Sequence, residues 1–257
     1  MNLNVTDLEM DPLGYPFREV LDKKGQTVVR LEYFAESYPE DPNMWIVYTK
    51  RLNELYVNGF GGFKTYTLDS VTSMEMTSRL FGKKLNPKGD QRHWGGYRTD
   101  QLEQVLCMGL AAVPINIVLC CHCSEEKDDV NGSFVRTLHA PARLGEKRGL
   151  VSQYAEIYKM FVGRDEKGNS IHQAQTQPDS MWAAATQIDA PDPCWPSYDE
   201  LWVNWDSTNG KVLLRPPLHW ILYGDFGSGK STMAATFPKP MLVHMFDAFG
   251  KDMPYLK

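Results

Sequence analysis

The chain has 257 residues, of which 42% are hydrophobic and 23% are charged, a composition typical of one large or two small globular domains. Its net charge of −5 argues against a surface that is basic throughout, so any contact with nucleic acid must be local. No apolar run approaches the ~20 residues that span a bilayer, and the polar, acidic segment 1–12 lacks the features of a signal peptide. We therefore expect a cytoplasmic protein with no membrane partner.

The first part of the chain alternates between strand and helix patterns. Residues 1–26 carry Pro and Gly at punctuating positions and are expected to be irregular. The elements expected next are a strand at 27–34, a helix at 44–58, a strand at 63–68, a helix at 71–81, a helix at 99–112 and a strand at 115–121. The helix at 44–58 is indicated by the helical spacing of its apolar residues Trp45, Tyr48, Leu52, Leu55 and Tyr56.

The second part of the chain begins with a polar loop at 124–149. The elements expected after it are strands at 154–162 and 171–176 around a turn at 164–169, an extended segment at 177–211 with a helical turn near 198–202, a strand at 219–223, a short helix from Lys230 that ends before Pro238, and a strand at 240–246. This alternation predicts an α/β fold with a mainly parallel sheet flanked by helices.

Four of the five cysteines cluster, and the run from Cys120 through Cys121 and His122 to Cys123 invites a zinc interpretation. Adjacent residues on a strand point to opposite faces and cannot converge on one ion. No second Cys/His pair at zinc-site spacing follows. We therefore favour buried strand cysteines in a reducing compartment over a metal site.

A phosphate-loop motif lies near the C-terminal end of the chain. The pattern G-x-x-x-x-G-K-[ST] is matched in full by the segment Gly224-Asp225-Phe226-Gly227-Ser228-Gly229-Lys230-Ser231. The glycines let the backbone fold around a phosphate, and the amides from Gly227 to Thr232 are expected to point inward. Lys230 is expected to reach the β- and γ-phosphates, and Ser231 to ligate Mg²⁺. The motif predicts ATP and Mg²⁺ as ligands; the alternative is a glycine-rich turn that binds nothing.

Three polar side chains at strand ends are candidates for the rest of the site, because the carboxyl edge of a parallel sheet faces the ligand crevice. Asp69 is expected to hold the Mg²⁺ shell; alternatively it caps the next helix, a role that Ser70 could also fill. His122 either senses the γ-phosphate or positions a water, or it is a loop histidine bonded to backbone. Asp247 follows a strand expected beside the P-loop strand, and is either the general base or a turn residue.

These segments resemble the RecA-like AAA-type ATPases of phages, the phage nucleotide-binding protein group linked to recombination and single-strand annealing. The resemblance is carried by HWILYGDFGSGKSTMAATFPKPMLV, FKTYTLDSVTSM, INIVLCCHCSEE, and APARLGEKRGLVSQYAEIYKMFV followed by HQAQTQPDSMWAAATQI. In that family the P-loop comes near the N-terminus, whereas here reading from Pro217 to Lys257 and then from Met1 restores the family order.

The resemblance implies a circularly permuted RecA-like P-loop NTPase forming one domain over residues 1–257. Residues 1–205 would supply the central strands, residues 206–217 the new join, and residues 218–257 the P-loop strand, its helix and the next strand. Permutation is tolerated when the old termini lie close together, so Met1 and Lys257 are expected to be neighbours. The alternative is completion by a neighbouring subunit, as in domain swapping.

In RecA-like proteins the loops after the central strands face DNA, and cations with interleaved aromatics suit unpaired strands. Two loops here lie in matching places. The candidate contacts to single-stranded DNA are Lys83, Lys84, Arg92, Trp94, Arg98, Arg136, Arg143, Lys147 and Arg148. The alternative is a pair of solvated loops. The resemblance also implies a homo-oligomer in which Arg143, Lys147 or Arg148 completes a neighbour's site.

The function implied is an ATPase that acts in phage DNA recombination or replication. The catalytic set would be Lys230, Asp69, Asp247 and His122, contributing positioning and electrostatics rather than covalent chemistry. Two alternatives stay open. One is a nucleotide-dependent binding module with little turnover, such as a helicase loader or a packaging accessory. The other is an inactive fragment that binds no nucleotide.

Overall fold

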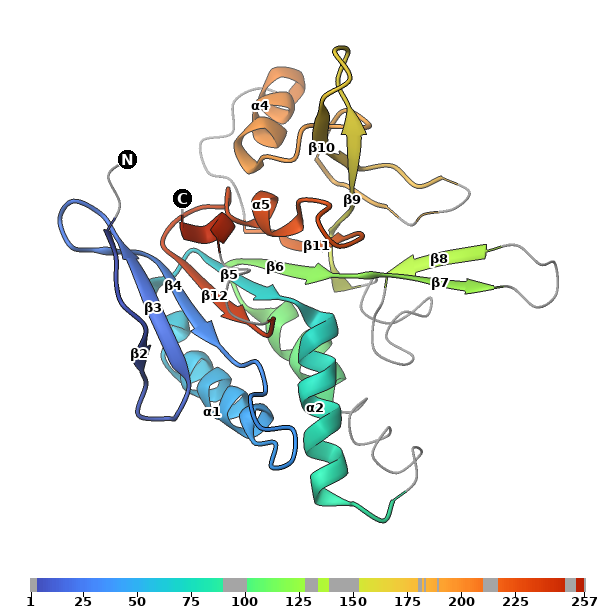
Figure 1. Cartoon of the computed structure of the whole chain (residues 1–257). Coiled ribbons are helices and arrows are strands. Elements are labelled where there is room, and N and C mark those ends of the chain that lie inside the picture. Colours follow the sequence, from blue (N-terminus) through green and yellow to red (C-terminus); the bar gives the residue numbers. More distant parts are fainter. Residues whose placement is uncertain are drawn as a thin grey trace.

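The computed structural model describes residues 4–89, 101–127, 134–138, 153–179, 182, 184–188, 190–209, 217–247 and 253–256. The strands in these ranges are β1 (Asn4–Val5), β2 (Glu9–Met10), β3 (Pro16–Leu21), β4 (Thr27–Tyr33), β5 (Thr65–Asp69), β6 (Asn116–Cys121), β7 (Cys123–Lys127), β8 (Phe134–Leu138), β9 (Glu156–Arg164), β10 (Ser170–Gln175), β11 (His219–Tyr223) and β12 (Met241–Met245). Ten of them form one sheet in the order β1-β3-β4-β12-β5-β6-β11-β9-β10, with β2 paired to β3 (Figure 1).

The centre of this sheet is parallel. Every neighbouring pair from β4 through β12, β5, β6 and β11 to β9 runs in the same direction. Antiparallel strands occur at the two edges, where β3 pairs with β4 and β10 pairs with β9. β5 and β6 are buried along their whole length, as expected for strands covered on both faces. The predicted α/β class with a mainly parallel sheet is therefore confirmed.

Helices cover both faces of the sheet (Figure 1). They are α1 (Met44–Val57), η1 (Gly59–Gly62), α2 (Val71–Leu85), η2 (Gln104–Gly109), η3 (Leu110–Ala112), α4 (Tyr198–Asn209), α5 (Lys230–Ala234) and η6 (Met253–Leu256). One apolar layer contains residues of α1, α2 and η2, and the other contains residues of α4, α5 and η6. Cys121 belongs to the first layer and Cys120 to the second, because neighbouring strand residues point to opposite faces.

Three local predictions are wrong, and one differs only in the type of helix. Residues 1–26 are not irregular, because β3 pairs along β4 and carries β1 and β2. The loop predicted at 124–149 contains the hairpin β7–β8. The helix predicted at 99–112 is helical over its described residues 101–112, but only 101–103 are α-helical, and a π-helical turn and a 3₁₀ turn follow. Residues 206–209, predicted as linker, continue α4.

The C-terminal segment is interleaved with the rest of the sheet. β11 lies between β6 and β9, and β12 lies between β4 and β5. The prediction that the strand before Asp247 adjoins the P-loop strand is therefore wrong, since β5 and β6 separate β12 from β11. Met1 and Lys257, predicted to be neighbours, lie outside the described residues. In the described part of the chain, no helix combines the length and apolarity needed to cross a bilayer.

Candidate functional site

The parallel register brings the ends of four strands to one edge of the sheet. Asp69 of β5 is in register with Cys120 of β6 and with Met245 of β12. Tyr223 of β11 is in register with Cys121 of β6. The phosphate loop begins at Gly224, directly after Tyr223, so it starts two residues beyond the level of Asp69 at the same edge.

Two glycines allow the phosphate loop to pack closely against its neighbours. A Cβ on Gly224 would lie 2.2 Å from the carbonyl oxygen of Met160 on β9. Gly229 has φ +95°, in the left-handed region, and a Cβ there would lie 2.7 Å from Cγ of His172 on β10. Only glycine fits both positions without displacing the β9–β10 hairpin.

Lys230 lies beneath the loop, with its side chain 7% exposed. Its Nζ donates to the carbonyl oxygens of Gly224 at 3.0 Å and Asp225 at 2.8 Å. The ammonium group is therefore held at the centre of the turn by backbone oxygens. An anionic ligand would gain from this positive charge, since the charge is largely shielded from water.

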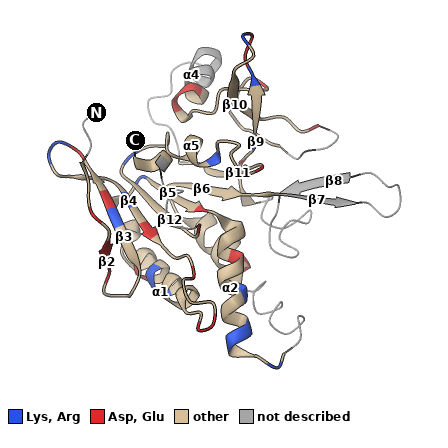
Figure 2. Cartoon of the chain, in the orientation of Figure 1, with Lys and Arg blue, Asp and Glu red and all other residues tan. Residues whose placement is uncertain are grey.

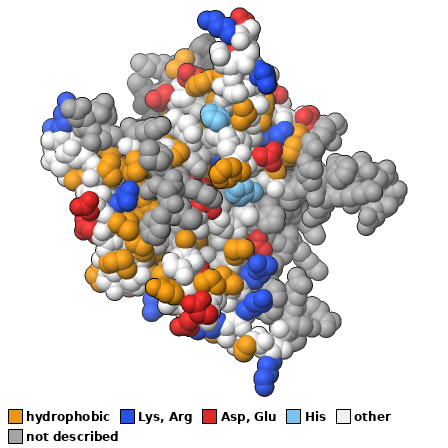
Figure 3. All heavy atoms as spheres, in the orientation of Figure 1, with side chains coloured by type: hydrophobic (Ala, Val, Ile, Leu, Met, Phe, Trp, Pro, Cys, Tyr) orange, Lys and Arg blue, Asp and Glu red, His pale blue; other side chains and the backbone are white. Residues whose placement is uncertain are grey.

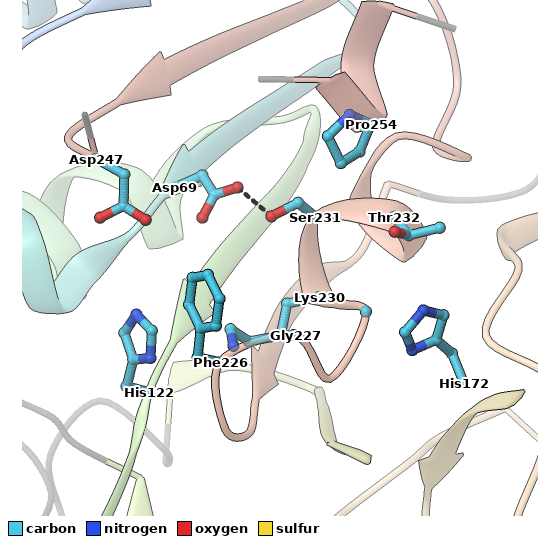
Figure 4. A pocket seen from close by; sticks show the side chains of 11 residues that line it. Asp69, His122, His172, Phe226, Gly227, Lys230, Ser231, Thr232, Asp247 and Pro254 are labelled. Carbon is cyan, nitrogen blue, oxygen red and sulfur yellow. Dashed lines mark hydrogen bonds between the residues drawn. The ribbon is translucent and has the colours of Figure 1, made fainter. Parts of the chain in front are cut away.

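The central contact of the site joins Ser231 on α5 to Asp69 on β5. Ser231 Oγ donates to Asp69 Oδ2 at 2.6 Å, across 162 residues of sequence (Figure 4). Tyr255 of η6 donates its hydroxyl to the same oxygen at 2.9 Å. Ser70 caps α2 by accepting from the backbone N–H of Ser73 at 3.3 Å, so α2 does not need Asp69 as its cap.

Burial raises the pKa of Asp69 above its usual value, because the side chain is shielded from water. The hydrogen bonds from Ser231 and Tyr255 act in the opposite direction and only partly compensate. The nearby carboxylate of Asp247 raises the pKa further, whereas the charge of Lys230 lowers it. A cation beside Asp69 would favour its ionised form in the same way as Lys230.

A cavity of about 330 Å³ opens at this edge, within the size range of small-molecule sites. Its lining residues are Asp69, His122, His172, Phe226, Gly227, Gly229, Lys230, Ser231, Thr232, Asp247 and Pro254 (Figure 4). The lining includes all four predicted catalytic residues and six of the nine predicted ligand-binding residues. The other three, Gly224, Asp225 and Ser228, form the turn whose oxygens surround the Lys230 ammonium group.

The cavity has a polar wall on the side of β5, β6 and β12. Asp247 accepts a hydrogen bond from Ser73 Oγ, and the His122 backbone N–H donates to Thr72 Oγ1 at 3.2 Å. Phe226 stands at the tip of the loop with its side chain 76% exposed. Figure 3 shows histidine side chains above and below a hydrophobic group near the centre of this face.

Sequence reasoning missed three residues of the site: His172, Pro254 and Tyr255. His172 lies within the predicted strand at 171–176, which is β10. No local pattern shows that β10 pairs with β9, or that β9 in turn pairs with β11, the strand before the P-loop. Pro254 and Tyr255 belong to a short 3₁₀ turn, for which the sequence carries no periodic signal.

Most of the predicted DNA contacts lie outside the described residues: Arg92, Trp94, Arg98, Arg143, Lys147 and Arg148. Lys83 and Lys84 belong to the last turn of α2 rather than to a loop, where cations suit the helix end (Figure 2). Lys84 Nζ pairs with Asp41 at 2.7 Å. Since α2 begins beside Asp69 and rises ~1.5 Å per residue, this end is about 20 Å from the site. Arg136, predicted in a loop, lies on β8.

The donor set fits a magnesium nucleotide. A serine hydroxyl and a carboxylate are oxygen ligands of the kind Mg²⁺ prefers, and Mg²⁺ commonly takes its remaining ligands from phosphates and water. The buried ammonium of Lys230 supplies positive charge beside them. Comparison of the chain with protein-family models, with curated proteins and with solved structures produced no significant match.

Proposed function

We propose that the protein binds ATP with Mg²⁺ at this edge of the sheet and hydrolyses the terminal phosphoanhydride. The proposal is carried by one observation, the 2.6 Å contact that joins the serine of the phosphate loop to a buried strand-end carboxylate. A glycine-rich turn that binds nothing would not require a buried lysine next to its serine, or a hydrogen bond from that serine to a carboxylate far away in the sequence. Structural ion pairs alone would not call for glycines at both ends of the loop.

In the proposed mechanism Ser231 and Asp69 would hold Mg²⁺, which supplies charge neutralisation for the phosphate oxygens when bound. Lys230 exchanges its carbonyl partners for phosphate oxygens and stabilises the charge that develops on them. Asp247 and His122, on the same wall of the cavity, are the groups available to orient an attacking water.

We further propose that the fold is RecA-like and that the protein acts in phage DNA recombination or replication. Three segments that carry the family resemblance are β5, β6 and β11, and they are consecutive in the sheet. The two strands of the C-terminal segment lie inside the sheet, with β11 between β6 and β9 and β12 between β4 and β5, which suits a permuted order. A homo-oligomer with a trans-acting arginine and contacts to single-stranded DNA belong to the same proposal.

The test is ATP binding and hydrolysis in the presence of Mg²⁺, with and without single-stranded DNA. Lys230→Ala is expected to lower turnover by about 10²–10³-fold, the usual effect of removing one group that stabilises the transition state. Asp69→Ala is expected to lower turnover and to raise the Mg²⁺ concentration that turnover requires, because it removes one ligand of the metal. Lys167→Ala, at the solvent-exposed turn between β9 and β10, is the matched lysine control and should match the wild type.

The outcomes separate the candidate functions. Turnover stimulated by single-stranded DNA supports a recombination ATPase. Tight ATP binding without turnover supports a nucleotide-dependent binding module. If Lys230→Ala leaves both nucleotide affinity and turnover unchanged, the site assignment is wrong.

A further inference from the structure

The cavity has two unlike sides, which are separated by the P-loop strand. Asp69, His122 and Asp247 come from β5, β6 and β12, all on one side of β11 in the sheet. His172 comes from β10, which lies beyond β9 on the other side of β11. In Figure 4, His172 lies near Thr232, away from the two carboxylates.

The position of Ser231 and Asp69 sets the direction in which a bound nucleotide would lie across the cavity. Ser231 and Asp69 would hold a cation that neutralises the terminal phosphates, so these phosphates would lie toward β5. The phosphate chain then runs along the loop, and the nucleoside emerges at the opposite side, beyond Gly229 and Thr232. Among the described lining residues, no carboxylate, lysine or arginine stands on that side. An uncharged wall suits an uncharged, aromatic nucleoside.

His172 is placed to form this wall. Its ring packs against the loop so closely that a Cβ on Gly229 would lie 2.7 Å from Cγ and 2.8 Å from Nδ1. Nδ1 is buried, yet it has no hydrogen-bond partner among the described residues. An imidazole that lines the cavity and is held against the phosphate loop by packing is placed to contact a ligand through its ring.

We propose that His172 is the nucleoside-contacting residue of the site, and that its ring packs against the ribose and base of a bound nucleotide. This inference rests on the proposed function, because it takes the phosphate chain to lie in the loop. It adds that the site recognises a nucleotide rather than a bare polyphosphate, and that recognition comes from the β9–β10 hairpin.

The experiment compares the affinities of two probes, Mg²⁺·ATP and Mg²⁺·triphosphate, by calorimetry. His172→Ala should weaken ATP binding about tenfold, the scale of losing one aromatic stack on a base, and should leave inorganic triphosphate within about twofold. His172→Phe keeps a flat ring against the loop and should bind ATP within about threefold of the wild type. Ser170→Ala, on the exposed start of the same strand, is the control and should change neither affinity.

Thermal denaturation of each variant checks that the loop and hairpin remain folded. If His172→Ala weakens both ligands equally, or leaves ATP binding unchanged, the inference is wrong. Equal loss of both ligands in His172→Phe also overturns it. Failure of the wild type to bind either probe would instead remove the proposed function, so the two failures can be told apart.

Discussion

Replacing Gly229 with alanine tests the packing of the phosphate loop against β10 without reference to any ligand. An alanine at φ +95° is expected to cost about 1–2 kcal/mol for the left-handed backbone alone. The new Cβ would also lie 2.7 Å from His172 Cγ, a contact that forces overpacking at about 1–3 kcal/mol more. For a domain of this size each kcal/mol lowers Tm by about 2–4 °C.

Gly227 provides the matched control. Its φ is +77°, but a Cβ there would meet nothing within 4 Å. Gly227→Ala should therefore lose only the stability that the left-handed backbone costs. The Tm of Gly229→Ala should lie about 2–12 °C below the Tm of Gly227→Ala. The assay is thermal and urea denaturation followed by circular dichroism, with the urea dependence checked for an unchanged slope.

The double variant Gly229→Ala, His172→Ala identifies the source of the difference. Removing the ring eliminates the contacts at 2.7 and 2.8 Å, but Cβ of residue 172 stays 3.1 Å from the new methyl group, so recovery should be partial. Equal melting temperatures for the two glycine variants, or no recovery in the double variant, would refute the packing argument.

Three further predictions concern buried charge. Glu32→Gln should cost about 3–5 kcal/mol of stability, because the fully buried Glu32 pairs through Oε2 with buried His244 Nε2 at 2.9 Å and through Oε1 with partly buried Arg51 at 2.8 Å. Glu54→Gln, with the side chain 46% exposed, is the control. Burial alone would raise the pKa of Glu32, but the hydrogen bonds from His244 and Arg51 outweigh burial and lower this pKa. In thermal melts the wild type should therefore lose its stability advantage over Glu32→Gln as pH falls below about 4.5. A difference in Tm between the two proteins that does not change with pH would count against this explanation. Asp69→Asn should raise the Tm of the ligand-free protein at pH 7 but not at pH 3. The pKa of the buried carboxyl is raised, so its ionised form destabilises the fold only as pH rises through that pKa. An unchanged Tm at pH 7 would show that burial is not the dominant influence on the pKa of Asp69. Tyr255→Phe removes a hydrogen-bond donor to Asp69, so the pKa of Asp69 should rise further. The acid limb of the pH profile of Mg²⁺-dependent nucleotide binding should then move to higher pH. Tyr38→Phe, at an exposed position, should leave this profile unchanged.

Local patterns in the chain were sufficient for much of the secondary structure. The spacing of the apolar residues at 44–58 predicted α1, and Trp45, Tyr48, Leu52 and Leu55 are buried there whereas Tyr56 is exposed. The apolar runs predicted β6, β11 and β12, and the motif identified the phosphate loop. These features depend on backbone periodicity and on a few consecutive residues, which is why they can be read without knowledge of the fold.

The arrangement of the strands was not accessible in this way. Pairing depends on contacts between residues far apart in the chain, so β12 was expected beside β11 but lies beyond β6 and β5. The same limit hid His172, which reaches the loop through the β9–β10 hairpin, and Tyr255, which reaches Asp69 from a turn 186 residues away. Asp69 could be named as a candidate from its position at a strand end, but its 2.6 Å contact with Ser231 exists only because parallel strands bring their carboxyl ends to one edge.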